Sequence, residues 1–341
     1  MKLSIMKSGI IVWDIDGVLI YVGDSYRRAI VQAVQYYFSE LIGLNLERNL
    51  MTIGDTQRFK LVGRFNDDWK LTYASVLCFL TKLIHDLDKR EIKSDSVKDF
   101  EGMINELRKL GTTAKGFDLQ LDLGYITERI KDEGGGLEGT ERALEEIFGE
   151  DLEIAKKFWF QNLIKRIFQE LYLGEMLFRE KYGEEPIFVK SDGLIKNEKA
   201  LINLKSLEKL REKFFMGVAT GRERFEAEFV LKKHEFDRFI PLDLIVSSED
   251  VEIGKPEPDQ LLECKRKICE KYNLDEKETN AVYVGDSIDD VAASKNAGFF
   301  SIGCLSAVSE DEEKKRLRRE FERLECDLIL EDANEILRIV G

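Results

Sequence analysis

The sequence has few of the residues that bind transition metals or form disulfides, and this narrows its chemistry. Five cysteines are scattered along the 341 residues without a Cys-x-x-Cys pair, so we expect buried thiols, with neither disulfides nor a zinc site. The two histidines, His85 and His234, lie far apart in the sequence, which argues against serine–histidine hydrolases and histidine-rich metal sites. Any catalysis must therefore rely on carboxylates, hydroxyls and lysine.

Long apolar runs and an excess of basic residues are also missing. No segment approaches the roughly 20 apolar residues of a membrane-spanning helix, and the first apolar run ends at Asp14, unlike a secretory signal. A net charge of −14 argues against a nucleic-acid-binding surface, which needs a basic face. We therefore expect a globular, cytoplasmic protein, long enough for two domains, without nucleic-acid or membrane partners.

Near the N-terminus an apolar segment ends in two carboxylates, in the order Ile10-Ile11-Val12-Trp13-Asp14-Ile15-Asp16-Gly17. The apolar residues are typical of a strand that is covered on both faces in a parallel sheet. In an extended chain Asp14 and Asp16 would lie on the same side, and Gly17 would allow a sharp turn. Two such carboxylates could bind a divalent cation, attack an electrophile or move a proton. The alternative is a solvated Asp-Gly turn at a strand end.

From about residue 200 onward, helices alternate with short apolar strands. Strands are predicted at 214–219, 242–246, 281–284, 299–303 and 327–330, and helices at 201–213, 223–235, 259–272 and 289–297. This alternation predicts an α/β fold with a doubly wound parallel sheet. The first strand must belong to the same sheet, because alone it could not bury its two faces.

Residues between about 25 and 185 have the periodicity of helices instead. Helices are predicted at 25–41 with Ser25 as N-cap, and at 69–87, 97–110, 125–132, 140–148 and 151–172, with an exposed loop at 134–136. We therefore expect an α/β domain of residues 1–21 and 200–341, and a mainly helical domain of residues 22–199 inserted after the first strand. The expected connections are Tyr21–Gly23 and Ser191–Gly193.

Polar motifs follow three of the later strands. They are Thr220-Gly221-Arg222, Gly254-Lys255-Pro256 and Gly285-Asp286-Ser287-Ile288-Asp289-Asp290. Taken singly, Thr220 could be a helix cap, Lys255 an exposed turn lysine, and Gly285–Ser287 a tight turn. Ligands of open α/β sheets bind just beyond the carboxyl ends of the strands, so the common position of the motifs favours a single site.

The four motifs, in this order, resemble those of the haloacid dehalogenase (HAD) superfamily. The resemblance covers roughly residues 1–21 and 200–341, and implies a Rossmann-like core. The insertion after the first strand is similar to the C1 cap of subfamily I, although it is larger than the usual small helical bundle. Members are mostly magnesium-dependent phosphatases, so the resemblance implies a phosphoric monoester hydrolase that acts on a small phosphorylated metabolite.

The resemblance also implies a role for each motif residue. Asp14 would attack phosphorus to give an aspartyl-phosphate, and Asp16 would act as general acid and then general base. Thr220 and the Gly221 N–H would hold phosphoryl oxygens, and Lys255 would neutralise charge on the transferred group.

A Mg²⁺ ion is the cofactor that the resemblance implies. Asp14, the backbone carbonyl of Asp16, and Asp286 would bind it, with Asp290 in or beside that shell. Asp289 competes with Asp290 for this supporting role.

Other activities of the superfamily remain open to different degrees. Haloacid dehalogenases usually lack an acid at the position of Asp16, and phosphonatases need a Schiff-base lysine that cannot be singled out here. Phosphomutases and phosphotransferases keep both acids, so they remain the main alternative. A non-catalytic binding protein of the same fold is a further alternative, although it would not need such crowded charge.

Substrate choice is expected to lie in the inserted domain. Its candidate specificity residues are Tyr26, Arg27, Arg64, Asn66 and Trp69. The alternative is that Arg27 and Arg28 are solvated helix residues, and that Phe65 and Trp69 belong to the core of the insertion.

Overall fold

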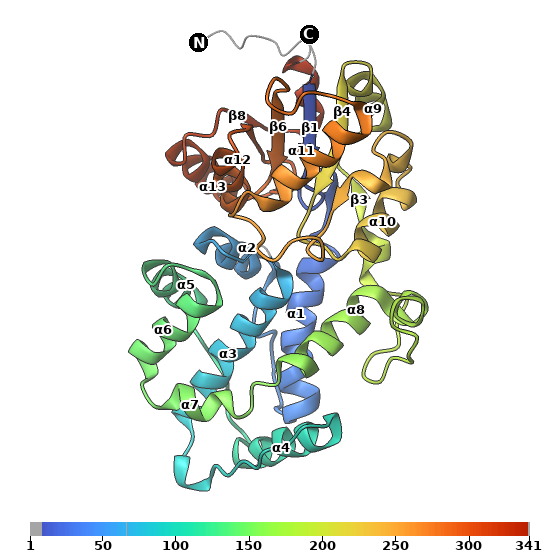
Figure 1. The fold of residues 1–341 in the computed structure, drawn as a ribbon. Coiled ribbons are helices and arrows are strands. Elements are labelled where there is room, and N and C mark those ends of the chain that lie inside the picture. The colour runs from blue at the N-terminus through green and yellow to red at the C-terminus, as the bar shows by residue number, and fades with distance from the viewer. Residues whose placement is uncertain (1–8, 66, 340–341) are drawn as a thin grey trace. The chain divides into compact units, whose positions relative to one another are not determined.

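The computed structural model describes residues 9–65 and 67–339. The chain divides into two compact units, a sheet unit of residues 1–22 and 198–341 and a helical unit of residues 23–197. Figure 1 shows the elements of both. No helix among the described residues is both long and apolar enough to cross a membrane.

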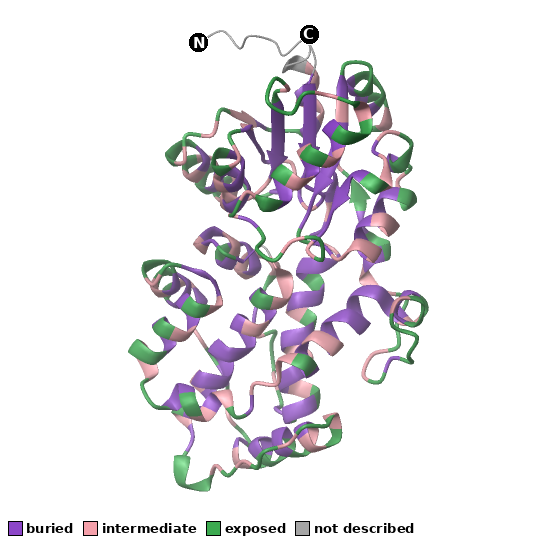
Figure 2. Cartoon of the chain, in the orientation of Figure 1, coloured by how far each residue is buried: buried purple, intermediate pink, exposed green. Residues whose placement is uncertain are grey.

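The sheet unit contains a parallel sheet, as predicted. Among the described residues it has six strands: β1 (Gly9–Trp13), β4 (Phe214–Ala219), β5 (Ile245–Val246), β6 (Ala281–Gly285), β7 (Phe300–Cys304) and β8 (Leu328–Leu330). Their order is β5-β4-β1-β6-β7-β8. All five residues of β1 are buried, and Figure 2 shows that most of the sheet is buried as well. β1 pairs with β4 on one side and β6 on the other, so the loops after these three strands are neighbours.

Helices cover the sheet. They are α9 (Leu204–Arg211), α10 (Arg224–Lys233), α11 (Asp259–Tyr272), α12 (Ile288–Asn296) and α13 (Asp311–Arg323). Side chains alternate along β1, and Ile10 and Val12 pack in one buried cluster with Leu261 and Ile268 of α11. The sequence predicted α11 with the same bounds, whereas α13 was not predicted.

A short antiparallel pair stands where the helical segment is inserted. β2 (Ile20–Tyr21) pairs with β3 (Lys199–Ala200), so the chain leaves and re-enters the sheet unit at neighbouring points. The sequence placed the returning connection at Ser191–Gly193, but the structure places these residues in the helical unit. There the Ser191 carbonyl accepts a hydrogen bond of 2.9 Å from the Glu175 N–H. A Cβ on Gly193 would lie 2.2 Å from the Leu173 carbonyl oxygen, so this glycine serves close packing.

The helical unit contains α1 (Tyr26–Tyr36), α2 (Ile53–Val62), α3 (Asp68–Asp86), α4 (Phe100–Thr113), α5 (Leu123–Asp132), α6 (Gly136–Phe148), α7 (Asp151–Lys156) and α8 (Gln161–Tyr182). A π-helical turn, Tyr37–Ile42, continues α1. Aspartates cap three of these helices: Asp67, Asp99 and Asp122 accept hydrogen bonds from the first-turn N–H groups of α3, α4 and α5. Ser25 precedes α1 as predicted, but its side chain makes no capping hydrogen bond.

Short 3₁₀ turns occupy Lys89–Glu91, Leu194–Asn197, Phe236–Arg238, Leu242–Leu244 and Ala333–Ile339. The turn at 242–244 replaces the first half of a predicted strand. The segment 151–172, predicted as one helix, is broken between α7 and α8. Gly174, with a non-helical φ of +71°, kinks α8 close to the predicted end, and a second helical stretch then ends at Tyr182. Gly135 and Gly136 are buried, in contrast to the predicted exposed loop, because the Gly136 N–H donates to the Gly63 carbonyl at 3.0 Å.

Candidate active site

Asp14 stands at the carboxyl end of the central strand. Its backbone N–H donates to the Val284 carbonyl at 2.9 Å, which extends the β1–β6 pairing by one residue. The Ile15 N–H donates to Asp14 Oδ1 at 2.8 Å, and the Asp14 residue is only 5% exposed. The chain then turns at Gly17, whose φ of +75° lies in the left-handed region that favours glycine. The carboxylate is therefore fixed in a buried position at the edge of the sheet.

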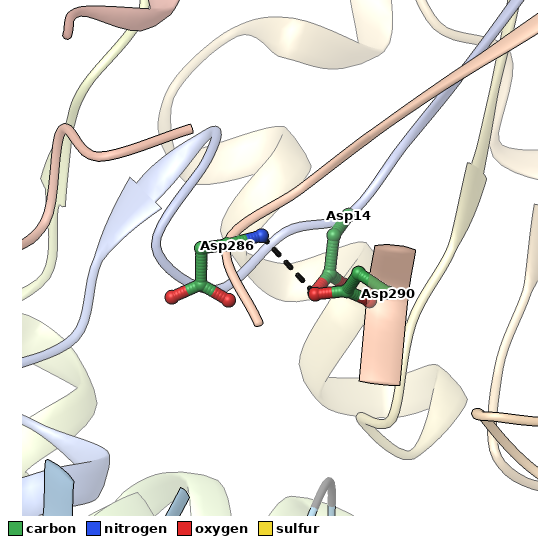
Figure 3. A group of neighbouring side chains, drawn as sticks. All are labelled: Asp14, Asp286 and Asp290. Carbon is green, nitrogen blue, oxygen red and sulfur yellow. Dashed lines mark hydrogen bonds between the residues drawn. The ribbon is translucent and has the colours of Figure 1, made fainter. Parts of the chain in front are cut away.

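Three carboxylates gather at this edge. One oxygen of each of Asp14, Asp286 and Asp290 lies within 4.8 Å of the others. Figure 3 shows their side chains and the hydrogen bond of 3.1 Å from the Asp286 N–H to Asp290 Oδ2. Carboxylate oxygens are the ligands that Mg²⁺ and Ca²⁺ prefer, so the donor set fits a hard divalent cation. This group of described residues includes Asp290 and not Asp289.

Lys255 is a buried cation that contacts the acidic cluster. Its side chain is 1% exposed, and its Nζ lies 3.1 Å from Asp14 Oδ2 and 2.6 Å from Asp290 Oδ1. It also donates to the Tyr283 hydroxyl at 2.8 Å. The reading of Lys255 as an exposed turn lysine is therefore wrong.

Asp290 organises this region by accepting from several donors. Its Oδ2 accepts hydrogen bonds from the Asp286 N–H and from the N–H and hydroxyl of Ser287, which forms a capping box with Asp290 at the start of α12. Its Oδ1 accepts from Lys255 and from the Tyr283 hydroxyl, at 2.9 Å for the latter. Five donors therefore share the roughly four lone-pair sites of this carboxylate. Asp290 is fully engaged by these contacts, which suits a group that orients Lys255 and the Asp286 loop.

Burial and charge perturb the pKa values of these groups. Burial raises the pKa of Asp14 well above its usual value, and the charges of Asp290, Asp16 and Asp286 raise it further, while Lys255 opposes them. Burial would also raise the pKa of Asp290, but Lys255 and the hydrogen bonds from Ser287 and Tyr283 bring it below its usual value. A cation bound at this cluster would relieve the repulsion among the carboxylates.

Asp16 contacts an arginine that the sequence did not single out. Arg222 Nε lies 2.7 Å and Arg222 Nη2 2.6 Å from Asp16 Oδ1. The other side of the guanidinium binds Glu198, with Nη2 3.0 Å from Oε1 and Nη1 3.2 Å from Oε2. The sequence predicts Glu198 within the insertion of residues 22–199, whereas the structure has it in the sheet unit, directly before β3.

Thr220 follows β4 and is fully buried. Its N–H donates to the Val246 carbonyl at 3.0 Å, and its own carbonyl accepts from Gln260 Nε2 at 2.8 Å. Its Oγ1 accepts from the Arg222 N–H at 3.3 Å, which still allows the hydroxyl to donate its proton elsewhere. Gly221 is exposed. The structure therefore holds residue 220 rigidly at the same sheet edge as Asp14.

The candidate specificity residues that the structure describes belong to the helical unit. Tyr26 is buried and stacks on Tyr172 and Phe168, with ring centroids 4.0 and 5.8 Å away, so it is part of the core of that unit. Arg27 is also buried, and Arg64 is exposed. Trp69 is half-buried, with Lys165 Nζ 3.4 Å from its ring centroid. Asn66 lies outside the described residues.

The architecture and the site together define a class of protein. It is an α/β protein with a Rossmann-like parallel sheet, an acidic cluster that fits a divalent cation, and a buried lysine beside a buried aspartate. The chain belongs to the haloacid dehalogenase-like hydrolases, because the model of that family matches residues 9–298. This confirms the resemblance seen in the sequence motifs.

Individual relatives match shorter parts of the chain. It is 28% identical over 163 residues, 48% of this chain and 63% of the relative, to "Putative pyrophosphatase PpaX" of Caldanaerobacter subterraneus subsp. tengcongensis. It is 36% identical over 67 residues to the phosphonoacetaldehyde hydrolase of Latilactobacillus sakei subsp. sakei, 20% of this chain and 23% of that one. The chain thus spans less than two thirds of the length of these curated relatives.

A solved structure matches over nearly the whole chain. An X-ray structure of a Northeast Structural Genomics Consortium target, 20% identical, superposes with a TM-score of 0.66 over 97% of this chain and 98% of that one. The match supports the fold, including the large helical insertion.

Proposed function

We propose that the protein is a Mg²⁺-dependent phosphomonoesterase that acts on a small phosphorylated metabolite through an aspartyl-phosphate on Asp14. The observation that supports it best is the approach of Lys255 Nζ to Asp14 Oδ2, 3.1 Å, within the acidic cluster. A buried lysine beside a buried carboxylate suits a site that receives a dianionic phosphoryl group. The names of the curated relatives, a pyrophosphatase and a phosphonoacetaldehyde hydrolase, also favour phosphorus-containing substrates.

In the first half-reaction the Asp14 carboxylate attacks phosphorus while the bond from phosphorus to the ester oxygen breaks. The departing alkoxide takes a proton from Asp16. In the second, Asp16 accepts a proton from water, which attacks phosphorus and breaks its bond to Asp14. Phosphate leaves, and both carboxyl groups return to their starting states.

Other residues of the site hold the phosphoryl group and the metal. The Thr220 hydroxyl and the Gly221 N–H would donate to phosphoryl oxygens, and Lys255 would offset their charge. Asp14, Asp286 and the carbonyl of Asp16 would bind Mg²⁺, which supplies electrostatic stabilisation of the transferred group when bound. Asp290 would support this arrangement through its contacts with Lys255 and the Asp286 loop.

The helical unit would act as the cap that selects the substrate, with the α/β unit carrying the chemistry. Arg64 is the candidate that this proposal tests most directly, because its side chain is exposed and not part of the packed core. We expect Arg64→Ala to raise KM for the natural substrate while sparing an aryl phosphate. The cytoplasmic location expected from the sequence stays a prediction.

The decisive experiment measures phosphate release from a panel of sugar phosphates, phosphoglycolate, histidinol phosphate, nucleotides and an aryl phosphate, with and without Mg²⁺. Asp14→Asn should abolish release, whereas Asp237→Asn, an exposed aspartate, should not. Acid quenching during turnover, followed by mass spectrometry, should locate a phosphoryl group on Asp14. No metal-dependent release from any substrate would overturn the proposal, and phosphate transfer to a second hydroxyl without release would favour a mutase.

A further inference from the structure

Arg222 is a buried arginine that joins two carboxylates in the sheet unit. Its side chain is 1% exposed, that of Glu198 is 0% exposed and that of Asp16 is 15% exposed. Two nitrogens, Nε and Nη2, contact the same oxygen of Asp16, Oδ1. Nη1 and Nη2 reach separate oxygens of Glu198, as expected for the fork geometry of a guanidinium.

Stability alone does not account for such an arrangement. Desolvation of a buried ion pair costs free energy that its Coulomb attraction often fails to exceed, so apolar residues of similar volume are frequently as stable. What the contacts do is hold one particular atom of Asp16, its Oδ1, with two nitrogens of Arg222. Because Arg222 uses Oδ1, Oδ2 is the oxygen that remains to exchange a proton.

We propose that Arg222, oriented by Glu198, is a positioning residue that presents Asp16 Oδ2 to the leaving group and to the attacking water. This inference rests on the phosphatase function proposed above. Arg222 acts through Asp16, since its nitrogens point at two carboxylates and its side chain has almost no exposed surface with which to reach a phosphoryl oxygen.

The backbone around both partners is held in place. The Arg222 carbonyl accepts hydrogen bonds from the N–H and the hydroxyl of Ser248, at 3.0 and 3.2 Å. The Glu198 carbonyl accepts from Lys233 Nζ at 3.3 Å, and Glu198 is followed directly by β3. The guanidinium therefore connects the loop after β4, the returning chain at β3 and the loop that carries Asp16.

The test compares two substrates that differ in their need for an acid. The leaving group of 2,4-dinitrophenyl phosphate departs without protonation, whereas that of glycerol phosphate requires it. In Arg222→Met we expect kcat for glycerol phosphate to fall about 100-fold with little change in KM, as for a loss of general acid–base help. With the dinitrophenyl ester we expect a burst of about one dinitrophenol per site, followed by slow turnover, because only the water-dependent step still needs Asp16.

Control variants separate positioning from folding. Arg224→Met changes a neighbouring arginine that contacts Asp250, and should leave both substrates unaffected. Arg222→Lys and Glu198→Gln keep part of the hydrogen-bond network, so they should give intermediate rates. If circular dichroism shows that Arg222→Met does not fold, these two variants take its place in the test. Added to Asp16→Asn, Arg222→Met should cause no further loss, because both variants remove the same function.

The outcomes distinguish this inference from the function on which it rests. Multiplicative losses in the double variant, or equal losses on both substrates without a burst, would overturn the positioning role while leaving a phosphatase. A wild-type protein without activity on any phosphate ester would instead overturn the proposed function.

Discussion

Gly17 and Asp286 approach each other so closely that a Cβ on Gly17 would lie 1.9 Å from Asp286 Oδ2. The loop after β1 and the loop after β6 are therefore in direct contact, backbone against carboxylate. Residue 17 also has a φ of +75°, which side chains rarely adopt. The position of a candidate metal ligand thus depends on the absence of a side chain on the neighbouring loop.

Substitution Gly17→Ala should impair the metal site more than the fold. The methyl group must displace the Asp286 carboxylate, so we expect the Mg²⁺ concentration for half-maximal activity to rise at least tenfold. Gly43→Ala is the matched control, since Gly43 has a φ of +87° with nothing within 4 Å of an added Cβ. It carries the same backbone strain, about 1 kcal/mol, and should leave the Mg²⁺ dependence unchanged; equal effects of both variants would contradict the clash.

Mg²⁺ should stabilise the folded protein through the acidic cluster. A cation that binds only the native state adds about 2.7 kcal/mol at one hundred times its Kd, which a thermal melt detects as a rise of several degrees. Asp286→Asn removes a ligand charge and should abolish most of this rise, whereas Asp289→Asn should retain it, because Asp289 is outside the cluster. An unchanged shift in Asp286→Asn would argue against this metal position.

Substitution Tyr283→Phe should remove a hydrogen-bond partner of Lys255. The Tyr283 hydroxyl accepts from Lys255 Nζ at 2.8 Å and donates its single proton to Asp290 Oδ1 at 2.9 Å, with the Ala219 carbonyl oxygen 3.2 Å away, all in a buried region. Loss of these bonds should cost about 1–3 kcal/mol in urea unfolding and lower kcat, because Lys255 is less well oriented. Tyr272→Phe, which preserves the stacking of Tyr272 on Phe215, should change neither.

His234 should make stability fall in mild acid. Burial, together with the charges of Lys233 and Arg222, lowers the pKa of His234 from 6.5 to about 4. The unfolded chain therefore binds a proton below pH 6.5 that the folded chain does not bind until about pH 4, so stability decreases as pH falls through this range. From pH 7 to pH 4 the unfolding free energy of the wild type should fall by about 1 kcal/mol relative to that of His234→Phe. The effect is no larger because the ring is partly exposed and screened. A constant difference would show that His234 titrates normally.

The periodic parts of the fold could be predicted from the sequence. Phe214–Ala219 and Asp259–Tyr272 have the predicted bounds because one is a continuous apolar strand and the other an amphipathic helix. The helix α2 was missed, since Thr56 and Gln57 occupy buried positions where an apolar stripe would be expected. Its Thr52–Asp55 capping box is the signal that would have located its start.

The site was predicted only where motif residues follow strand ends. Asp14, Thr220, Lys255 and Asp286 come after the strands or in the loops between strands and helices, so the topology of a parallel sheet was enough to group them. Arg222 meets Asp16 and Glu198 across long stretches of sequence, and neither periodicity nor spacing records such a contact. Tyr283 lies within β6, where an apolar strand pattern gives no reason to expect a polar role.

The paired ends of the insertion also affect how the sheet can form. β1 pairs in register with β4, Gly9 opposite Phe214, across the whole helical unit. Within that unit Asn197 Nδ2 donates to the Asp24 carbonyl at 3.4 Å, although 173 positions separate the two residues. If the helical unit folds first, its two ends already lie side by side, so only a few residues remain in the loop that β1 and β4 must close. This shortening lowers the entropy cost of loop closure by about 3 kcal/mol. β1 and β4 can then pair about as fast as two strands that are close together in the sequence.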